Sequence, residues 1–177
     1  FLNIQGAANG EVNGPIANGT STGYTIAKAG AGKWTLNGTN TTTGAVYVQN
    51  GTLALGATGS ISNSAAVRIY DGTTFDVSAQ AGGWPLQAAQ ALEGNGVVQG
   101  SVVAAANSVL RPNVGATVNT AGTLTINGDL VLNGTTNFFN LSSDPSGVMS
   151  PSDVIQVNGN LSVAGLNTIW LENYVDG

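Results

Sequence analysis

Carboxylates are the only side chains of this sequence that offer familiar catalytic chemistry. The 177 residues contain no His and no Cys, which excludes Ser-His and Cys-His nucleophiles and imidazole or thiolate metal sites. Asp71 and Asp76 are the acids to weigh, because paired Asp side chains on one outer face are typical of β-structures that cleave polysaccharides. The simpler interpretation is a turn residue at Asp71 and a solvated surface acid at Asp76. We therefore predict no catalytic residue.

Two more acids, Asp144 and Asp153, lie in the polar run 142–153, which also contains several serines and two prolines. Their oxygen atoms are suitable ligands for calcium. The spacing matches neither an EF-hand nor a Gly-Gly-x-Gly-x-Asp repeat, so we interpret residues 142–153 as an inserted loop. We predict no metal site and no cofactor.

The composition favours strands. Hydrophobic residues make up 42% and charged residues only 7%, with 26 Gly, and Asn, Thr, Ser and Val replace the usual helix formers. The net charge is −5, and Lys28, Lys33, Arg68 and Arg111 are the four positive residues. No basic stripe can form from them, which argues against a nucleic-acid partner or an anionic membrane. No apolar run is long enough for a membrane helix.

The segment 46–55 is the pattern that recurs in the chain. Val46, Val48, Leu53 and Leu55 alternate with other residues on the two sides of an Asn-Gly pair, as expected for two short strands around a sharp corner. Similar segments are 69–77, 125–132 and 156–163.

The spacing of these segments predicts a solenoid. The first two are about 21 to 22 residues apart, and the last two about 31 because the loop 142–153 adds roughly ten. We therefore expect about eight coils, with each Asn-Gly or Asp-Gly bend above its predecessor. Asn-Gly between alternating runs is also the strongest short signal for a hairpin, so an antiparallel β-sandwich remains the alternative.

Residues 25–61 resemble the autotransporter-associated β-strand repeat, also called the passenger-associated transport repeat, and residues 91–165 resemble later parts of such proteins. Trp34 and Ala45 are mild departures from the pattern. The resemblance implies a right-handed parallel β-helix in a secreted or surface-displayed bacterial protein. The matching positions are Lys28, Gly30, Gly32, Leu36, Gly38, Asn40, Gly44, Val48, Gly51, Thr52, Leu53, Leu55 and Gly56.

We expect a single β-helix domain over residues 1–177, with a repeat-like part at 25–78 and later coils at 92–177. Residues 79–91 interrupt the pattern and are expected to form an irregular excursion. Pro85 within them cannot donate a ladder hydrogen bond, which predicts an edge or a corner.

Outward aromatic residues are the better candidates for binding. Tyr47 lies between inward Val46 and Val48, and Tyr70 lies about one coil further, near Arg68. Two tyrosines stacked beside an arginine can hold a sugar ring. A lateral aromatic stack that supports the sheet is the competing interpretation.

Two functions are open at this point. The first is a structural or adhesive extracellular segment, either a surface-displayed rod or a fibre-forming subunit. The second is a carbohydrate-binding or polysaccharide-cleaving β-helix. No capping helix is evident at either end, and uncovered coils present unpaired strand edges. We therefore expect end-to-end stacking with copies of the chain or with neighbouring coils of a longer chain.

Overall fold

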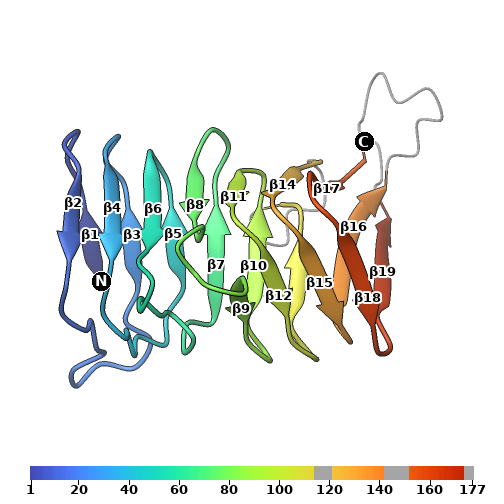
Figure 1. The fold of residues 1–177 in the computed structure, drawn as a ribbon, viewed down its shortest axis with the longest axis horizontal. Coiled ribbons are helices and arrows are strands. Elements are labelled where there is room, and N and C mark those ends of the chain that lie inside the picture. The colour runs from blue at the N-terminus through green and yellow to red at the C-terminus, as the bar shows by residue number, and fades with distance from the viewer. Residues whose placement is uncertain (114–120, 142–151, 174–177) are drawn as a thin grey trace.

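The chain winds as a parallel β-helix in the computed structural model, which describes residues 1–113, 121–141 and 152–173. Its strands form three sheets along the axis of the coil, and each strand pairs in parallel with the strand of the next coil (Figure 1). Within the described part of the chain there is no helix that could cross a membrane.

The first sheet contains eight strands: β1 (Leu2–Ile4), β3 (Ile26–Lys28), β5 (Val46–Val48), β7 (Ala66–Ile69), β10 (Ala91–Gly94), β13 (Val109–Arg111), β16 (Thr136–Leu141) and β19 (Thr168–Asn173). The second contains seven: β2 (Gly10–Val12), β4 (Lys33–Leu36), β6 (Thr52–Leu55), β8 (Thr74–Asp76), β11 (Val97–Gln99), β14 (Thr123–Asn127) and β17 (Val154–Val157). The third contains four: β9 (Trp84–Leu86), β12 (Val102–Ala104), β15 (Leu130–Asn133) and β18 (Leu161–Ala164).

The strand register confirms the predicted solenoid and excludes the sandwich. Val46 pairs with Val67 and Leu53 pairs with Phe75, one coil apart and in parallel. The eight strands of the first sheet correspond to the expected eight coils. The long late step is confirmed too, because 31 residues separate Asn127 from Asn158, its hydrogen-bond partner.

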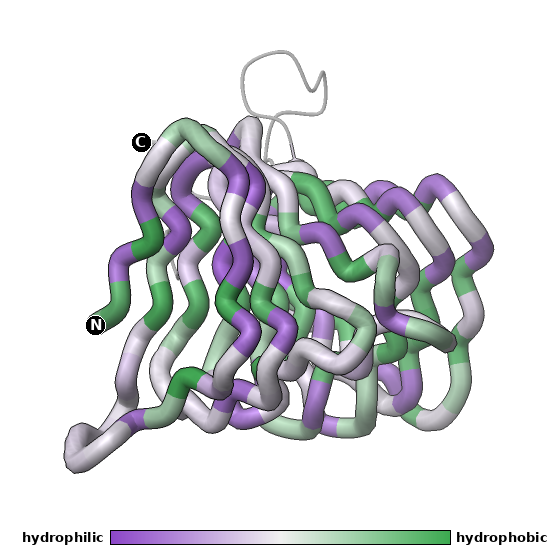
Figure 2. Tube along the Cα trace, turned by 60° about the vertical axis from the view of Figure 1, so that its left-hand side comes forward, coloured by the Kyte–Doolittle hydropathy of each residue, from purple (hydrophilic) through white to green (hydrophobic). Residues whose placement is uncertain are grey.

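The core is a set of apolar columns along the axis. Register partners such as Ile26, Val46 and Val67 point inward and are fully buried. Phe75 and Trp84 meet edge to face, with ring centroids 5.0 Å apart. Green hydrophobic segments of neighbouring coils accordingly lie side by side in Figure 2. Each fully buried aliphatic side chain contributes about 1.5–3 kcal/mol to the free energy of unfolding.

The bends do not form one column of corners, contrary to the prediction. Asn50 and Asp71 lie at the turns from the first sheet to the second, whereas Asn127, the last residue of β14, and Asn158 lie at the turns from the second sheet to the third. The expected stacking is therefore wrong for the step from Asp71 to Asn127. It is correct for Asn158, whose Nδ2 donates to Asn127 Oδ1 at 2.7 Å.

Two constraints favour glycine at these corners. Gly51 and Gly72 adopt positive φ angles of 66° and 69°, which side chains with a Cβ disfavour. Gly128 and Gly159 have no positive φ, but each lies against the backbone of the glycine one coil before: a Cβ on Gly128 would be about 2.5 Å from Gly100. An Asn-Gly pair thus marks a corner without identifying which corner it is.

The third sheet begins only at β9, inside the segment 79–91 that was expected to be an irregular excursion. Pro85 is the central residue of β9, and β9 is an end strand of its sheet, as the missing N–H predicted. Trp84 N–H donates to the carbonyl of Ser101, the residue just before β12. Because backbone groups alternate along a strand, Pro85 lies at the position that faces the open edge.

Candidate functional site

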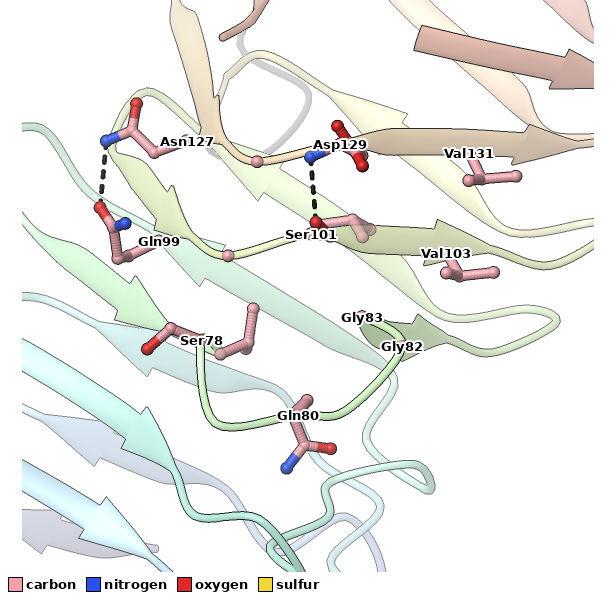
Figure 3. Close-up of a pocket in the computed structure, with 14 residues that line it drawn as sticks. Ser78, Gln80, Gly82, Gly83, Gln99, Ser101, Val103, Asn127, Asp129 and Val131 are labelled. Atoms are coloured by element: carbon pink, nitrogen blue, oxygen red, sulfur yellow. Dashed lines mark hydrogen bonds between the residues drawn. The ribbon is translucent and has the colours of Figure 1, made fainter. Parts of the chain in front are cut away.

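A polar groove of about 510 Å³ lies where the second sheet turns into the third (Figure 3). The chain crosses this corner with two residues between β11 and β12, but between β8 and β9 it makes a longer loop with positive φ at Gly82 and Gly83. The loop leaves the groove open beside the later corners. The polar residues that line it are Ser78, Gln80, Gln99, Ser101, Asn127 and Asp129.

Hydrogen bonds between neighbouring coils order one wall of the groove. Asn127 Nδ2 donates to Gln99 Oε1 at 3.2 Å, and Asp129 N–H donates to Ser101 Oγ at 3.0 Å (Figure 3). Asn158 extends this series of amides by one coil. Gln80 points away from the groove and donates to the Gly59 carbonyl at 3.2 Å. The wall therefore offers mainly neutral amide and hydroxyl groups to a ligand.

Asp129 is the one carboxylate among the lining residues. Its Oδ1 accepts hydrogen bonds from the backbone N–H and the Nδ2 of Asn160, at 2.8 Å and 3.1 Å. General acid and base catalysis of glycoside cleavage ordinarily uses two carboxyl groups. Among the described residues, the groove is lined by neutral polar groups and by this single carboxylate.

Asp71 and Asp76, which the sequence suggested as a possible catalytic pair, do not form a pair in the structure. Asp71 is exposed in the turn before β8, and no contact between it and Asp76 occurs in the described residues. Asp76 instead pairs with Lys33 Nζ at 2.6 Å and accepts a hydrogen bond from Ser78 Oγ. Burial alone would raise the pKa of Asp76, but hydrogen bonds from Lys33 and Ser78 outweigh it and lower the pKa. Asp76 is thus a mostly buried acid that is paired with an exposed lysine.

The predicted stack of Tyr47 on Tyr70 is wrong, because the register places Arg68 opposite Tyr47. The Arg68 guanidinium lies 5.4 Å from the Tyr47 ring centroid and donates to its hydroxyl at 2.8 Å. On the next coil, Glu93 accepts from Arg68 Nε at 2.7 Å. The Glu93 hydrogen bond is the main reason that the pKa of Arg68 is raised.

This row continues along the outer face of the first sheet. Glu93 is the register partner of Arg111, whose guanidinium lies 4.3 Å from the Phe138 ring centroid. Phe138 packs against Trp170 with centroids 6.2 Å apart. Arg111 also pairs with Glu172 at 3.0 Å. Charged groups and rings in the row are largely paired with one another, so the row supports the sheet, although it is not the lateral aromatic stack of Tyr47 and Tyr70 that the competing interpretation expected.

Sequence reasoning found only the first members of this row. The signal for the rest was the outward position next to each inward apolar residue, as Glu93 follows Leu92 and Arg111 follows Leu110. The coils differ in length, because 21 residues separate Tyr47 from Arg68 but 25 separate Arg68 from Glu93. A fixed repeat length therefore does not predict which outward residues become neighbours.

Asp153, the last residue of the polar run 142–153, connects two strands through hydrogen bonds. Its carboxylate accepts hydrogen bonds from the N–H groups of Gly122 and Asn140, both at 2.7 Å, and so joins the start of β14 to β16. Burial raises the pKa of Asp153 in spite of these donors. Asp144 lies outside the described residues. Among the described residues there is no group of three or more potential metal ligands.

Lys28 occupies an inward position, between Ile4 and Val48 of the neighbouring coils, and is fully buried. Its ammonium donates to the Asn50 carbonyl at 3.1 Å and to the Gly30 carbonyl, both at the corner after the first sheet. Desolvation lowers its pKa. The lysine of the predicted repeat thus binds two corner carbonyls from inside the coil.

Comparison with known families identifies one segment of the chain. Residues 26–55, which contain β3 to β6, match the passenger-associated transport repeat. The resemblance noted in the sequence is thereby confirmed for this segment. A repeat of this kind indicates a secreted passenger β-helix and implies a secreted or cell-surface location. A search of curated proteins and a search of solved structures each found no match.

Proposed function

We propose that this chain is a non-enzymatic, extracellular rod on a bacterial surface that holds other elements away from the cell. The observation that carries the proposal is the first sheet, whose eight strands pair in sequence from β1 to β19 without interruption. With about 4.8 Å between strands, eight coils span roughly 35–40 Å. The passenger-associated repeat at residues 26–55 supports the extracellular setting.

The arrangement of the acids also supports a structural role. Asp76 is neutralised by Lys33, and Asp129 has no second carboxylate beside it in the groove. Incubation of the purified chain with a panel of acidic and neutral polysaccharides should therefore release no reducing ends. Turnover that disappears in Asp71→Asn or Asp76→Asn would overturn the structural proposal, provided that circular dichroism shows both variants folded.

A second candidate is glycan binding in the groove, favoured by the ordered amides of Gln99 and Asn127 beside Ser101. Such groups can donate to and accept from sugar hydroxyls. A glycan array tests this candidate with the wild-type chain and Gln99→Ala. Gln49→Ala is the matched control, because Gln49 is also exposed but lies at another corner. Binding lost in Gln99→Ala and kept in Gln49→Ala would support it, and no binding by the wild type would exclude it for the array sugars.

A further inference from the structure

Nine Asn-Gly pairs occur in the chain, and this dipeptide is chemically reactive. The backbone nitrogen of the glycine can attack Cγ of the asparagine, because glycine has no Cβ to obstruct the approach. In a folded protein the attack needs an asparagine amide that is free to move and a glycine N–H that is not donating elsewhere. The nine pairs begin at Asn9, Asn13, Asn18, Asn37, Asn50, Asn95, Asn127, Asn133 and Asn158.

Hydrogen bonds restrain eight of these nine pairs. In two pairs the glycine N–H is occupied: Gly96 donates to the Ile69 carbonyl at 3.2 Å, and Gly134 donates to the Ala164 carbonyl at 3.0 Å. In six further pairs the side-chain amide of the asparagine takes part in a hydrogen bond. The asparagines of these six pairs are Asn9, Asn13, Asn18, Asn37, Asn127 and Asn158.

The pair Asn50-Gly51 has neither restraint. The Asn50 side chain is exposed, and neither its amide nor the Gly51 N–H has a hydrogen bond to any residue that the structure describes. The backbone of this corner is nevertheless held, because Asn50 N–H donates to the Lys28 carbonyl at 3.2 Å and Thr74 N–H donates to the Gly51 carbonyl at 3.1 Å. The corner keeps its shape while both reacting groups stay available.

Lys28 acts on the same peptide group. Its ammonium donates to the Asn50 carbonyl at 3.1 Å, and this carbonyl belongs to the peptide bond that contains the Gly51 nitrogen. A charged donor at the oxygen stabilises negative charge on a peptide group. It therefore favours loss of the N–H proton, which the attack requires. The hydrogen bond is strengthened by its surroundings, because Lys28 is buried inside the coil.

We propose that Asn50 is a site of spontaneous deamidation, with Lys28 as the activating group and water as the second reactant. The Gly51 nitrogen loses its proton to solvent and forms a bond to Asn50 Cγ. The Cγ–Nδ2 bond breaks, and the departing nitrogen takes up a proton and leaves as ammonia. Water then adds to one carbonyl of the succinimide ring and breaks that carbonyl's bond to the ring nitrogen, which regains a proton. A carboxylate has replaced the amide.

The fold has room for the aspartate that this reaction produces. Val48 and Ile69 are register partners, and two residues later the first coil has Asn50-Gly51 where the next has Asp71-Gly72. The two glycines adopt similar φ angles, 66° and 69°. Aspartate at residue 50 can thus accumulate while the chain stays folded. This inference goes beyond the proposed function, because a rod does not need such a reaction.

Incubation of the folded chain in mildly alkaline buffer, followed by proteolysis and mass spectrometry, tests the proposal. Asn127 is the matched control, because its amide is bonded to Gln99 and Asn158. The deamidated fraction at Asn50 should grow about tenfold faster than at Asn127, whose amide must first leave its hydrogen bonds. In urea the two rates should become similar. Equal rates in the folded chain, or an unmodified Asn50, would overturn the proposal.

A variant of Lys28 tests the activation separately. Lys28→Met should slow the reaction at Asn50 several-fold in the folded chain but leave it unchanged in urea, a difference that a merely structural lysine would not produce. Lys33→Met removes an exposed lysine from another position and should leave the rate as in the wild type. The same rate in folded Lys28→Met and folded wild type contradicts the proposal. The comparison of Asn50 with Asn127 needs no variant, so it decides the matter if circular dichroism shows Lys28→Met unfolded.

Discussion

A middle coil and the last coil have the same local sequence pattern but opposite burial. Leu53 follows Asn-Gly-Thr and is 0% exposed, whereas Leu161 follows Asn-Gly-Asn and is 56% exposed. Both point toward the axis, but Leu53 has a coil on each side and Leu161 only on one. The pattern determines the direction of a side chain, and the neighbouring coil determines whether it is buried. Stability in this molecule is therefore a sum of contacts between adjacent coils.

The largest expected effect contrasts these two leucines. Leu53→Ala should lower the free energy of unfolding by about 3–4 kcal/mol, because it leaves a cavity between two coils. Leu161→Ala should cost less than about 1 kcal/mol. Urea unfolding followed by circular dichroism gives both values. Equal losses would contradict the view that neighbours determine burial.

The next test concerns the row on the first sheet. Arg68→Ala should lower the free energy of unfolding by about 1–2 kcal/mol, because it leaves the mostly buried Glu93 carboxylate without its partner. A double-mutant cycle with Glu93→Gln isolates the pair. Tyr47→Phe removes only the hydroxyl acceptor and should cost about 0.5 kcal/mol. A cycle with no coupling would mean that the row is not a support of the sheet.

A third test concerns the ammonium group of Lys28, which is buried inside the coil. The pKa of Lys28 is lowered in the folded state, so between that lowered pKa and the ordinary lysine value of 10.5 the unfolded chain binds more protons than the folded chain. Stability should therefore rise as pH increases through this window. Lys28→Met should remove this rise, whereas Lys33→Met, at the surface, should keep it. Urea titrations at several alkaline pH values measure the slope, and an unchanged slope in Lys28→Met would refute the assignment.

The smallest effect is expected at the ion pair of Asp76 with the exposed Lys33. Asp76→Asn should cost less than about 1 kcal/mol, since the exposed Lys33 is screened by solvent. Because the pKa of Asp76 is lowered on folding, its contribution is present above the unfolded pKa and is lost as pH falls through the folded one. Asp71→Asn, in an exposed turn, is the matched control. Thermal unfolding between neutral and acidic pH distinguishes the two variants.

Local periodicity made the coil predictable. Val46, Val48, Leu53 and Leu55 alternate, and the same inward positions return one coil later, so even the register of Val46 with Val67 followed from the sequence. The groove was not predictable in this way. It depends on the longer connection between β8 and β9, and the residues around it lie on three different coils.

By itself, the sequence determined the strand class, the winding and the approximate number of coils, because inward apolar positions and glycine corners are local properties that repeat. Only the tertiary structure decided which corner each bend occupies, that Arg68 rather than Tyr70 lies on Tyr47, and which leucines are covered. These features depend on the axial alignment of coils of unequal length. Unequal coils change which side chains become neighbours, even though the local pattern of each coil stays the same.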